Sequence, residues 1–536
     1  MGPHTGRTRL PRGLSIQIVW QIQGVSPLGL LLPKSKINAI RLAGFSHFDC
    51  DSLHRQSHQN QAGLGLTAFF FLHFLMSKPS VPKGTRDFNP ADMARRMFIF
   101  NTIRNVFERC GFVPIETPAM ENLSTLTGKY GEEGDQLIFK ILNNGDFLDK
   151  ADADALAAKD AKKLAFSISK KALRYDLTVP FARFVVMHQN DLVFPFKRYQ
   201  MQPVWRGDRP GRGRYQEFYQ CDADIIGSDG LLNEVELVGI LDEVFSALGL
   251  PEFTIAINNR KILAGMAEVF GIADRLTDFT VALDKLDKIH KEGVLKELND
   301  RGFAPEAVNR ISDFLDQMTS VRDFTSTLNF VAQLLGNSEQ GMKGVEETRY
   351  VYETASALGL RGELKLDLTL ARGLNYYTGA IFEVKAGGTG IGSISGGGRY
   401  DDLTGVFGLS GMSGVGISFG ADRIYDVLEE LGLFPDYLTS SLDAMFANFG
   451  PAEAAYALPH LRRLRMMGLR AELYPDAAKM KKQFKYADDR HVRLTIIAGA
   501  DEMAKGIFLV KDMQSGTQTE VSAAQLPDTV ARLLGH

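Results

Sequence analysis

Apolar side chains recur at helical spacing in the stretch NPADMARRMFIFNTIRNVFERCG, residues 89–111. Asn89 can cap such a helix, Pro90 suits its first turn, and Gly111 can end it. The apolar positions are Met93, Met97, Phe100, Ile103 and Phe107. Because they share one face at a period of 3.6 residues, they predict an amphipathic helix over this stretch.

Short apolar runs after this helix predict strands. The first, FVPIETPAM (112–120), contains Pro118, and a proline inside a strand favours an edge or interface position. We expect further strand-rich segments at 175–186, 196–205 and 215–226. The last two should pair as a hairpin across the loop between them.

The pattern changes twice in the second half of the chain. A helix is expected over about 231–248, followed by a mainly helical stretch over 260–345 that looks like an inserted module. Strand-like runs then resume in 363–386 and 414–432. From about 441 to 536, short apolar runs alternate with helical stretches, which predicts a small α/β domain with a largely parallel sheet.

Composition narrows the possible classes of protein. The net charge of −3 gives no global basic field, so any nucleic acid must bind to local patches. The three cysteines, Cys50, Cys110 and Cys221, are too far apart in the sequence for a zinc motif or a disulfide framework. No apolar run reaches about 18 residues, which argues against a spanning helix. We expect a cytoplasmic protein without a membrane partner.

Residues 1–75 differ from the rest of the chain. They contain two acidic residues, Asp49 and Asp51, but five of the ten histidines, and they show no sustained period. An acid-poor leader with arginines is typical of a transit peptide. An ordered domain is another interpretation, and a third is a non-native extension ahead of a true start at Met76. We expect a non-native or disordered extension that carries no catalytic residue.

Arginines crowd the loop between the two strands of the expected hairpin. In WRGDRPGRGRYQEF (205–218) they stand at Arg206, Arg209, Arg212 and Arg214, separated by glycines. Guanidinium groups match phosphate oxygens bidentately, so the loop is a candidate phosphate site, while a solvated tip or a nucleic-acid patch is the alternative. Arg423, in GISFGADR, opens a helix after Gly420 and could hold the other end of a polyphosphate, although such arginines are often surface charges. The chain has no P-loop and no GxGxxG, which argues against Walker ATPases and Rossmann enzymes.

Together these segments resemble a known family. The helix and strand around Pro118, the loop WRGDRPGRGRYQEF and GISFGADR are similar to motifs 1, 2 and 3 of class II aminoacyl-tRNA synthetases. LARGLNYYTGAIFEV (370–384) and SGGGRYDDL (395–403) resemble the two signature peptides of the histidyl-tRNA synthetase family. LRYDLTVPFARF and KKQFKYADDR also match that family, and the resemblance covers roughly 76–536.

The resemblance implies an α/β protein with an α+β catalytic core. It implies an antiparallel sheet of six or seven strands flanked by helices, a helical insertion and a C-terminal α/β anticodon-binding domain. The expected divisions are 1–75 for the extension, 76–258 and 346–438 for the two parts of the catalytic core, 259–345 for the insertion and 439–536 for the anticodon-binding domain. A homodimer joined through motif 1 is also implied.

The implied activity is that of a histidine–tRNA ligase. The carboxylate of L-histidine attacks the α-phosphorus of ATP, giving histidyl-adenylate and pyrophosphate, and the histidyl group then passes to histidine tRNA. In this interpretation Arg206 and Arg372 hold the α-phosphate and Arg423 holds the γ-phosphate, so these three arginines are the expected catalytic residues. Phe218 stacks on adenine, with a core position in the hairpin as the alternative. Asp208 contacts adenine or orients an arginine, with a solvated carboxylate as the alternative. Mg²⁺ is expected to accompany ATP.

The same resemblance assigns a pocket for histidine. Asp176, helped by Thr178 and Gln220, is the candidate for the ammonium group. Asp224 and Tyr377 are the candidates for the imidazole, because each ring nitrogen needs a partner. Tyr400 closes the pocket, Arg372 and Tyr376 complete the expected histidine-binding set, and the glycines at 396–398 let the backbone come close to the substrate. The alternative for Tyr377 and Tyr400 is an ordinary core position.

Contacts with histidine tRNA are expected from Arg209 and Arg212 on the loop and from Lys482 and Phe484 in KMKKQFKY. Lysines beside aromatic rings suit RNA phosphates and bases, although a solvated helix face is equally open. Two other functions compete with the ligase. One is a regulatory paralogue without catalysis, which would commonly lack both Arg372 and the C-terminal domain. The other is a pure RNA-binding module, which would leave the amino-acid pocket unexplained.

Overall fold

The computed structural model describes residues 79–128, 131–318, 320, 321, 323–371, 376–435, 438 and 442–535. The prediction for residues 1–75 therefore lies outside the described residues. Among the helices that the structure describes, none is long and apolar enough to cross a membrane.

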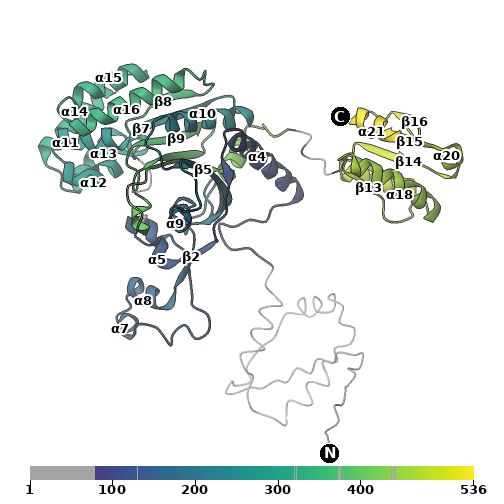
Figure 1. Ribbon diagram of the computed structural model, residues 1–536, viewed down its shortest axis with the longest axis horizontal. Coiled ribbons are helices and arrows are strands. Elements are labelled where there is room, and N and C mark those ends of the chain that lie inside the picture. The colour runs from purple at the N-terminus through teal and green to yellow at the C-terminus, as the bar shows by residue number, and fades with distance from the viewer. Residues whose placement is uncertain are drawn as a thin grey trace, which may run out of the picture. The chain divides into compact units, whose positions relative to one another are not determined.

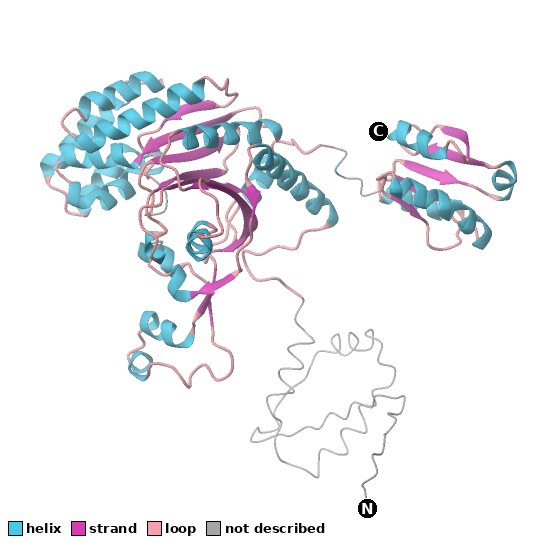
Figure 2. Ribbon diagram, in the orientation of Figure 1, coloured by secondary structure: helices cyan, strands magenta, loops and turns pink. Residues whose placement is uncertain are grey.

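A sheet of eight strands forms the centre of the fold, in the order β1-β5-β6-β11-β10-β9-β7-β8 (Figures 1 and 2). Its strands are β1 (Val113–Pro114), β5 (Phe196–Trp205), β6 (Glu217–Ile226), β7 (Phe253–Asn259), β8 (Glu363–Leu366), β9 (Ala380–Ala386), β10 (Ser395–Tyr400) and β11 (Gly414–Gly420). The six inner strands are antiparallel, as expected, and the hairpin of β5 and β6 is confirmed. The sheet has eight strands rather than six or seven because β1 and β8 add a parallel pair at each edge.

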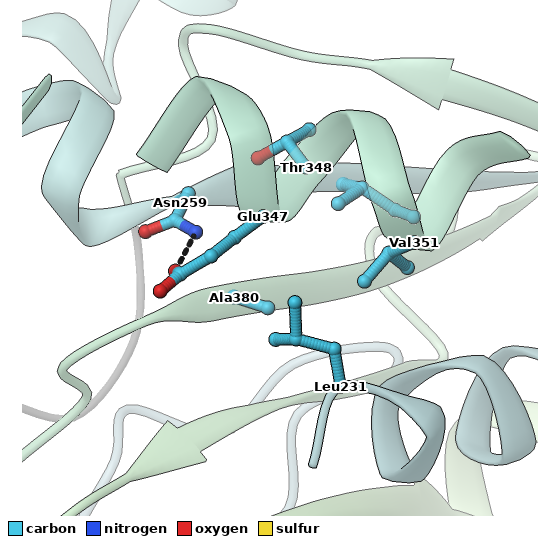
Figure 3. Close-up of a pocket in the computed structure, with 7 residues that line it drawn as sticks. Leu231, Asn259, Glu347, Thr348, Val351 and Ala380 are labelled. Carbon is cyan, nitrogen blue, oxygen red and sulfur yellow. Dashed lines mark hydrogen bonds between the residues drawn. The ribbon is translucent and has the colours of Figure 1, made fainter. Parts of the chain in front are cut away.

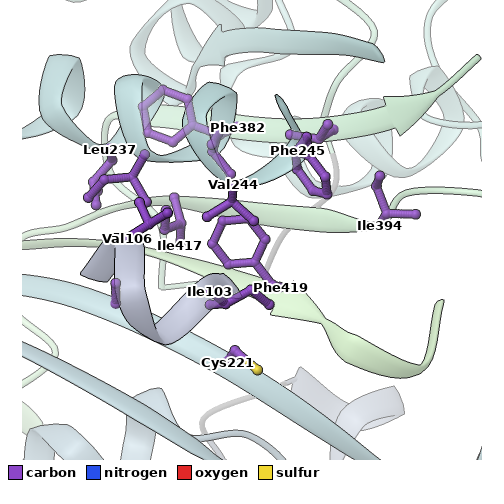
Figure 4. Close-up of a cluster of buried hydrophobic side chains, with 14 of the residues drawn as sticks. Ile103, Val106, Cys221, Leu237, Val244, Phe245, Phe382, Ile394, Ile417 and Phe419 are labelled. Atoms are coloured by element: carbon purple, nitrogen blue, oxygen red, sulfur yellow. The ribbon is translucent and has the colours of Figure 1, made fainter. Parts of the chain in front are cut away.

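Helices cover one face of this sheet and bury the main core. They are α4 (Pro90–Arg109), α10 (Leu232–Ala247), α16 (Glu339–Ser356) and α17 (Ala421–Glu430). In Figure 4, Phe245 and Phe419 lie together between helix and sheet, with ring centroids 5.4 Å apart. The predicted first helix is confirmed, and Asn89 caps it by accepting hydrogen bonds from the backbone N–H groups of Ala91 and Asp92. Such a cap stabilises a helix by about 1 kcal/mol.

Of two expectations about the region before β5, one is wrong and the other, an edge strand interrupted at Pro118, is confirmed in part. Residues 175–186 do not form a strand, because α9 (Thr178–His188) occupies most of them. Residues 112–120 split between β1 at the sheet edge and β2 (Met120–Asn122), which pairs with β4 (Lys171–Leu173) in a small separate sheet with β3 (Lys140–Ile141). Short helices accompany that sheet: α5 (Leu123–Leu126), α6 (Gly131–Gln136), α7 (Ala153–Ala157) and α8 (Ala161–Ile168).

The predicted helical stretch over 260–345 is confirmed, and its hydrophobic cluster also includes Ala256, Leu366 and Ile381 of the strands β7, β8 and β9. The helix α16 packs along it. Its helices are α11 (Arg260–Phe270), η1 (Ala273–Arg275), α12 (Leu276–Leu283), α13 (Leu286–Asp300), α14 (Pro305–Met318) and α15 (Phe324–Leu334). The exact domain boundaries stay a prediction.

Residues 442–535 form an α/β unit with a five-stranded sheet in the order β13-β12-β14-β15-β16. Its strands are β12 (Ala444–Phe446), β13 (Ala471–Leu473), β14 (Leu494–Ile497), β15 (Ile507–Asp512) and β16 (Gln518–Ser522), and its helices are α18 (Pro451–Met466), α19 (Met480–Asp489), α20 (Ala500–Lys505) and α21 (Leu526–Leu534). The sheet is mixed rather than largely parallel, because β15 and β16 return as an antiparallel pair.

Candidate active site

On the face of the large sheet opposite the main core, most of β6 carries polar side chains. Side chains alternate between the two faces of a strand. Along β6, Cys221, Ala223 and Ile225 belong to the main core, so the residues between them face the other way. Those residues are Phe218, Gln220, Asp222 and Asp224. We call this side of the sheet the polar face.

Glycines on neighbouring strands leave space on the polar face. The register pairs Asp224 with Gly416, and Gly416 with Gly398. A Cβ atom at Gly416 would lie 2.0 Å from Asp224 Oδ1, and one at Gly398 would lie 3.0 Å from Tyr377 Cδ1. Both positions therefore require glycine to make room for side chains of the candidate site.

Asp224 lies at the centre of this arrangement and is buried. The Tyr400 hydroxyl donates to its Oδ1 at 2.7 Å, and the Arg198 guanidinium lies 2.7 Å from its Oδ2. Burial raises the pKa of Asp224, while the charge of Arg198 and the Tyr400 hydrogen bond oppose that rise. Tyr400, expected to close a pocket, is thus a buried aromatic that also orients a carboxylate.

Asp176 approaches the same place from the segment before α9. Its Oδ1 accepts a hydrogen bond from the Val179 N–H at 3.2 Å, and its Oδ2 accepts one from the Tyr376 hydroxyl at 3.3 Å. Thr178 is half-buried at the start of α9. Burial raises the pKa of Tyr377, and Asp224, Asp222 and Asp176 raise it further. The structure therefore brings the predicted histidine-binding carboxylates and tyrosines together.

Gln220 and Asp222 continue the polar face along β6. The Gln220 side-chain amide donates to Ser418 Oγ at 2.7 Å, while its Oε1 is buried and finds no partner among the described residues. Asp222 is 2% exposed and was not among the predicted site residues. In a predicted strand the CDAD sequence puts both aspartates on one face, but only the structure reveals that this face is the one that carries the candidate site.

Arg206 follows directly after the last residue of β5. Its Nε donates to the backbone carbonyl of Tyr175 at 3.1 Å, and its guanidinium carbon lies 4.3 Å from the ring centroid of Tyr175 and 5.2 Å from that of Phe218. Phe218, half-buried on the polar face, thus holds this arginine against one side of the site. Its role as an adenine platform stays a prediction.

Arg423 comes from the first turn of α17. Its Nε donates to the Gly213 carbonyl at 2.7 Å and its Nη1 to the Ser393 carbonyl at 2.6 Å. Burial lowers the pKa of Arg423, and the positive charges of Arg206 and Arg214 lower it further. Three guanidinium groups therefore crowd one another at this end of the site, which is an arrangement that an anion would stabilise.

The loop 206–216 is fastened to α17. Asp426 accepts hydrogen bonds from the Gly213 N–H and from the Tyr215 hydroxyl. Asp208 forms an ion pair with Arg214 at 3.3 Å, so it orients an arginine of the loop. Arg209 and Arg212 are exposed, and Arg212 pairs with Glu430 at 2.8 Å.

Arg198 is the other residue that sequence reasoning missed. It is fully buried, stacks 4.2 Å from the ring centroid of Phe181 and carries the charge opposite Asp224. A buried arginine on a strand is the signal that could have revealed it, but burial is not visible in the sequence. Arg372 lies outside the described residues, so its expected role stays a prediction.

The remaining two predicted residues lie on α19 of the C-terminal unit. Lys482 is exposed, with its Nζ 6.0 Å from the ring centroid of Tyr474. Phe484 is half-buried, and Lys511 Nζ lies 4.3 Å from its ring centroid. A lysine and an aromatic ring are thus available on this helix, as RNA contacts would require.

A small pocket lies elsewhere, on the helix-covered side of the sheet between α16 and the strands β7 and β9 (Figure 3). Its lining is mostly apolar, and its one polar pair is closed, because Asn259 Nδ2 donates to Glu347 Oε2 at 3.0 Å. This pocket does not belong to the polar face and offers no reactive group.

Comparisons with known proteins agree with the geometry. A family model for histidyl-tRNA synthetase matches residues 150–424, and one for an anticodon binding domain matches residues 444–533. A histidine–tRNA ligase of Phocaeicola vulgatus is 56% identical over 452 residues, covering 84% of this chain and 99% of that protein. One of Christiangramia forsetii is 58% identical over 449 residues, covering 83% and 98%. The crystal structure of a histidyl-tRNA synthetase from Nostoc is 33% identical with a TM-score of 0.72, covering 85% of this chain and 99% of that one. The chain belongs to the histidyl-tRNA synthetase family.

Proposed function

We propose that this chain activates L-histidine with ATP and transfers the histidyl group to the 3′ end of histidine tRNA, as a histidine–tRNA ligase. One observation carries the proposal: buried carboxylates and tyrosines meet a cluster of arginines on a single face of the sheet. Such a site combines groups that suit an amino acid with groups that suit a polyphosphate.

The amino acid would lie over the polar face. Asp176, Thr178 and Gln220 would hold the ammonium group, while Asp224 and Tyr377 would contact the imidazole and Tyr400 would keep Asp224 in place. The 2.7 Å hydrogen bond from Tyr400 to Asp224 supports this assignment. A pocket of buried polar groups rejects apolar side chains strongly, because its own donors and acceptors would be left unpaired.

The phosphates would lie at the arginine end. Arg206 would hold the α-phosphate, where negative charge builds as the carboxylate attacks, and Arg423 would hold the γ-phosphate. Mutual repulsion between these arginines, seen in the lowered pKa of Arg423, supports an anionic ligand. Phe218 would support adenine beside Arg206, and Arg372 would add a second cation at the α-phosphate, as the family resemblance implies.

Mg²⁺ would accompany ATP. Among the residues that the structure describes, no group of three or more His, Cys, Asp or Glu side chains could hold a metal ion. Mg²⁺ commonly binds through substrate phosphates and water, so we assign no protein ligand set to it and derive no step from it.

The remaining partners follow from surfaces and composition. Arg209, Arg212, Lys482 and Phe484 would contact the tRNA. A homodimer would form through α4 and β1, since β1 is an edge strand and the neighbouring side chains of Met97 and Val113 are exposed by 41% and 46%. The sparse, widely spaced cysteines fit a reducing cytoplasm.

Histidine-dependent ATP–pyrophosphate exchange tests the proposal, run with each of the twenty amino acids. We expect exchange with histidine alone and a loss of kcat/KM in Arg206→Ala of roughly 100- to 1,000-fold, typical of one lost transition-state donor. Arg462→Ala, an exposed arginine of α18, is the matched control and should exchange normally. Folded protein that exchanges with no amino acid would favour the regulatory paralogue instead.

A further inference from the structure

Asp222 stands in the middle of the polar face without an assigned role. It lies between Gln220 and Asp224 along β6, and the register places Gln200 of β5 and Ser418 of β11 on either side of it. Asp222 is 2% exposed, and its Oδ1 has no hydrogen-bond partner among the described residues. Buried carboxylate oxygens are rarely left without a partner, so this atom needs an explanation.

A second unpartnered acceptor lies beside it. Gln220 Oε1 is also buried and finds no partner in the described part of the chain. The amide nitrogen of the same side chain does have one, since it donates to Ser418 Oγ. Two positions apart on one strand, the two side chains share a face. Two buried acceptors side by side indicate a ligand that brings several N–H donors.

The charges around Asp222 favour a positive ligand. From β5 it faces Arg198, from β6 Asp224, and from the segment before α9 Asp176, while β11 contributes only the Ser418 hydroxyl. Arg198 lies 2.7 Å from Asp224 Oδ2, so its charge is largely committed to that carboxylate. Arg174, whose hydrogen bonds go to neutral groups, also interacts with the charge of Asp222, and so does the Tyr377 hydroxyl. Among the described residues around Asp222, three carboxylates thus face two guanidinium groups, one of which is committed to Asp224.

The protonation of Asp222 reflects its burial first and the neighbouring carboxylates second. Burial raises the pKa of Asp222 to about 7; Asp224 and Asp176 also raise it, whereas Arg198 and a hydrogen bond from Ser418 lower it. Near neutral pH about half of the molecules therefore carry a proton on this carboxyl group. A cation arriving beside it would favour the ionised form and expel that proton.

We propose that Asp222 is a further specificity residue, which binds the α-ammonium group of the amino-acid substrate together with Gln220 and Asp176, and which releases its proton when that group binds. The inference rests on the proposed function, because it takes histidine as the ligand of the polar face. Asp224, which has Tyr400 at one oxygen and Arg198 at the other, would contact the imidazole ring instead of the ammonium group.

Calorimetric titration in buffers with different ionisation enthalpies tests the proposal by counting the protons released. The two ligands are L-histidine and 3-(imidazol-4-yl)propanoate, which keeps the ring and carboxylate but lacks the ammonium group. The α-ammonium group lowers the pKa of the imidazole ring, so the two free ligands carry different numbers of protons, and each ligand is therefore compared between the wild type and Asp222→Asn. At pH 7 the wild type should release about half a proton more than the variant when histidine binds, because only the wild type can ionise Asp222, and the two proteins should not differ when the propanoate binds. Histidine should also bind more tightly as the pH rises through about 7, since binding is coupled to proton loss.

Asp222→Asn, which keeps the shape of the side chain, should abolish the extra release. It should weaken histidine binding roughly 10- to 100-fold, as expected for a lost hydrogen bond to a charged group, and leave the propanoate almost unaffected. Equal proton release by the wild type and Asp222→Asn on binding histidine would overturn the role of Asp222. So would a wild-type affinity for histidine that does not change with pH near 7 once the ionisation of the free imidazole is accounted for, a measurement that needs no variant. A wild-type chain that binds neither ligand would overturn the proposed function itself.

Discussion

Single atoms decide the geometry of the proposed histidine pocket, and Gly416 is the clearest example. A Cβ atom there would lie 2.0 Å from Asp224 Oδ1, so Gly416→Ala must displace that carboxylate from Tyr400 and Arg198. We expect histidine to bind at least roughly tenfold more weakly, because a charged hydrogen-bonding group leaves the site. Calorimetric titration of the variant with histidine measures this loss.

Gly390→Ala is the matched control for Gly416→Ala. Gly390 lies in the exposed loop between β9 and β10, and no atom stands within 4 Å of its would-be Cβ. The control should bind histidine as the unaltered chain does. If Gly416→Ala also bound histidine normally, Asp224 could not be a direct ligand of the imidazole.

The sequence identified some site residues and not others for a physical reason. Arg206, Asp176 and Asp224 were predicted because they stand inside motifs of the resembled family, and the structure brings them together. Asp222 and Arg198 were missed because their meaning depends on strand register and burial. Register follows from pairing between distant segments, which a single sequence does not display.

Between elements, the loop 206–216 and the helix α17 act as one unit. The Tyr215 hydroxyl donates to Asp426 Oδ2 at 2.9 Å, Asp426 also accepts from the Gly213 N–H, and the Gly213 carbonyl accepts from Arg423. Burial and Asp426 raise the pKa of Tyr215 to about 12, so the hydroxyl keeps its proton at neutral pH. The chain of hydrogen bonds therefore sets the position of Arg423 relative to the loop.

Tyr215→Phe removes one bond of this chain. We expect the KM for ATP in pyrophosphate exchange to rise roughly three- to tenfold, with unchanged histidine affinity. This is less than the full effect of a lost hydrogen bond to a carboxylate, because Tyr215 acts on the phosphates only through the position of Arg423. Tyr350→Phe, on the exposed side of α16, should change neither quantity. Loss of histidine affinity in parallel with ATP affinity would contradict a separate phosphate-binding unit.

The wrong prediction of a strand at 175–186 concerns a whole element, the helix α9. α9 buries Val179, Phe181, Ala182 and Val185, and its β-branched and aromatic residues are the types that favour strands. A short helix that is apolar on most of its circumference shows no clear period of 3.6, so pattern alone cannot separate it from a buried strand. Packing against Phe196 and Ile226 of the sheet decides the outcome.

For the whole molecule, the hydrophobic cores show which parts are independent. The C-terminal unit has its own clusters, built from residues between 442 and 530 that include Phe446, Phe508 and Leu526, and the main core of the large sheet contains none of them. Its mixed sheet was predicted only in part. Parallel strands were expected, whereas the antiparallel pair of β15 and β16, which a tight connection at 513–517 joins, was not. Separate cores predict that each part can fold without the other.

A chain that ends at residue 438 tests this independence. We expect histidine-dependent pyrophosphate exchange to fall by less than about threefold, because every described residue of the polar face is retained. Charging of histidine tRNA should fall by at least about 100-fold, because the shortened chain loses RNA-binding surface. Lys482→Ala in the full-length chain is the milder counterpart, and it should lower charging without altering exchange.

If the shortened chain stays folded by circular dichroism but loses exchange, the C-terminal unit must contribute to the adenylation site. If charging survives the truncation, recognition of the tRNA rests instead on the catalytic core, where Arg209 and the exposed arginines of its loop would have to supply it.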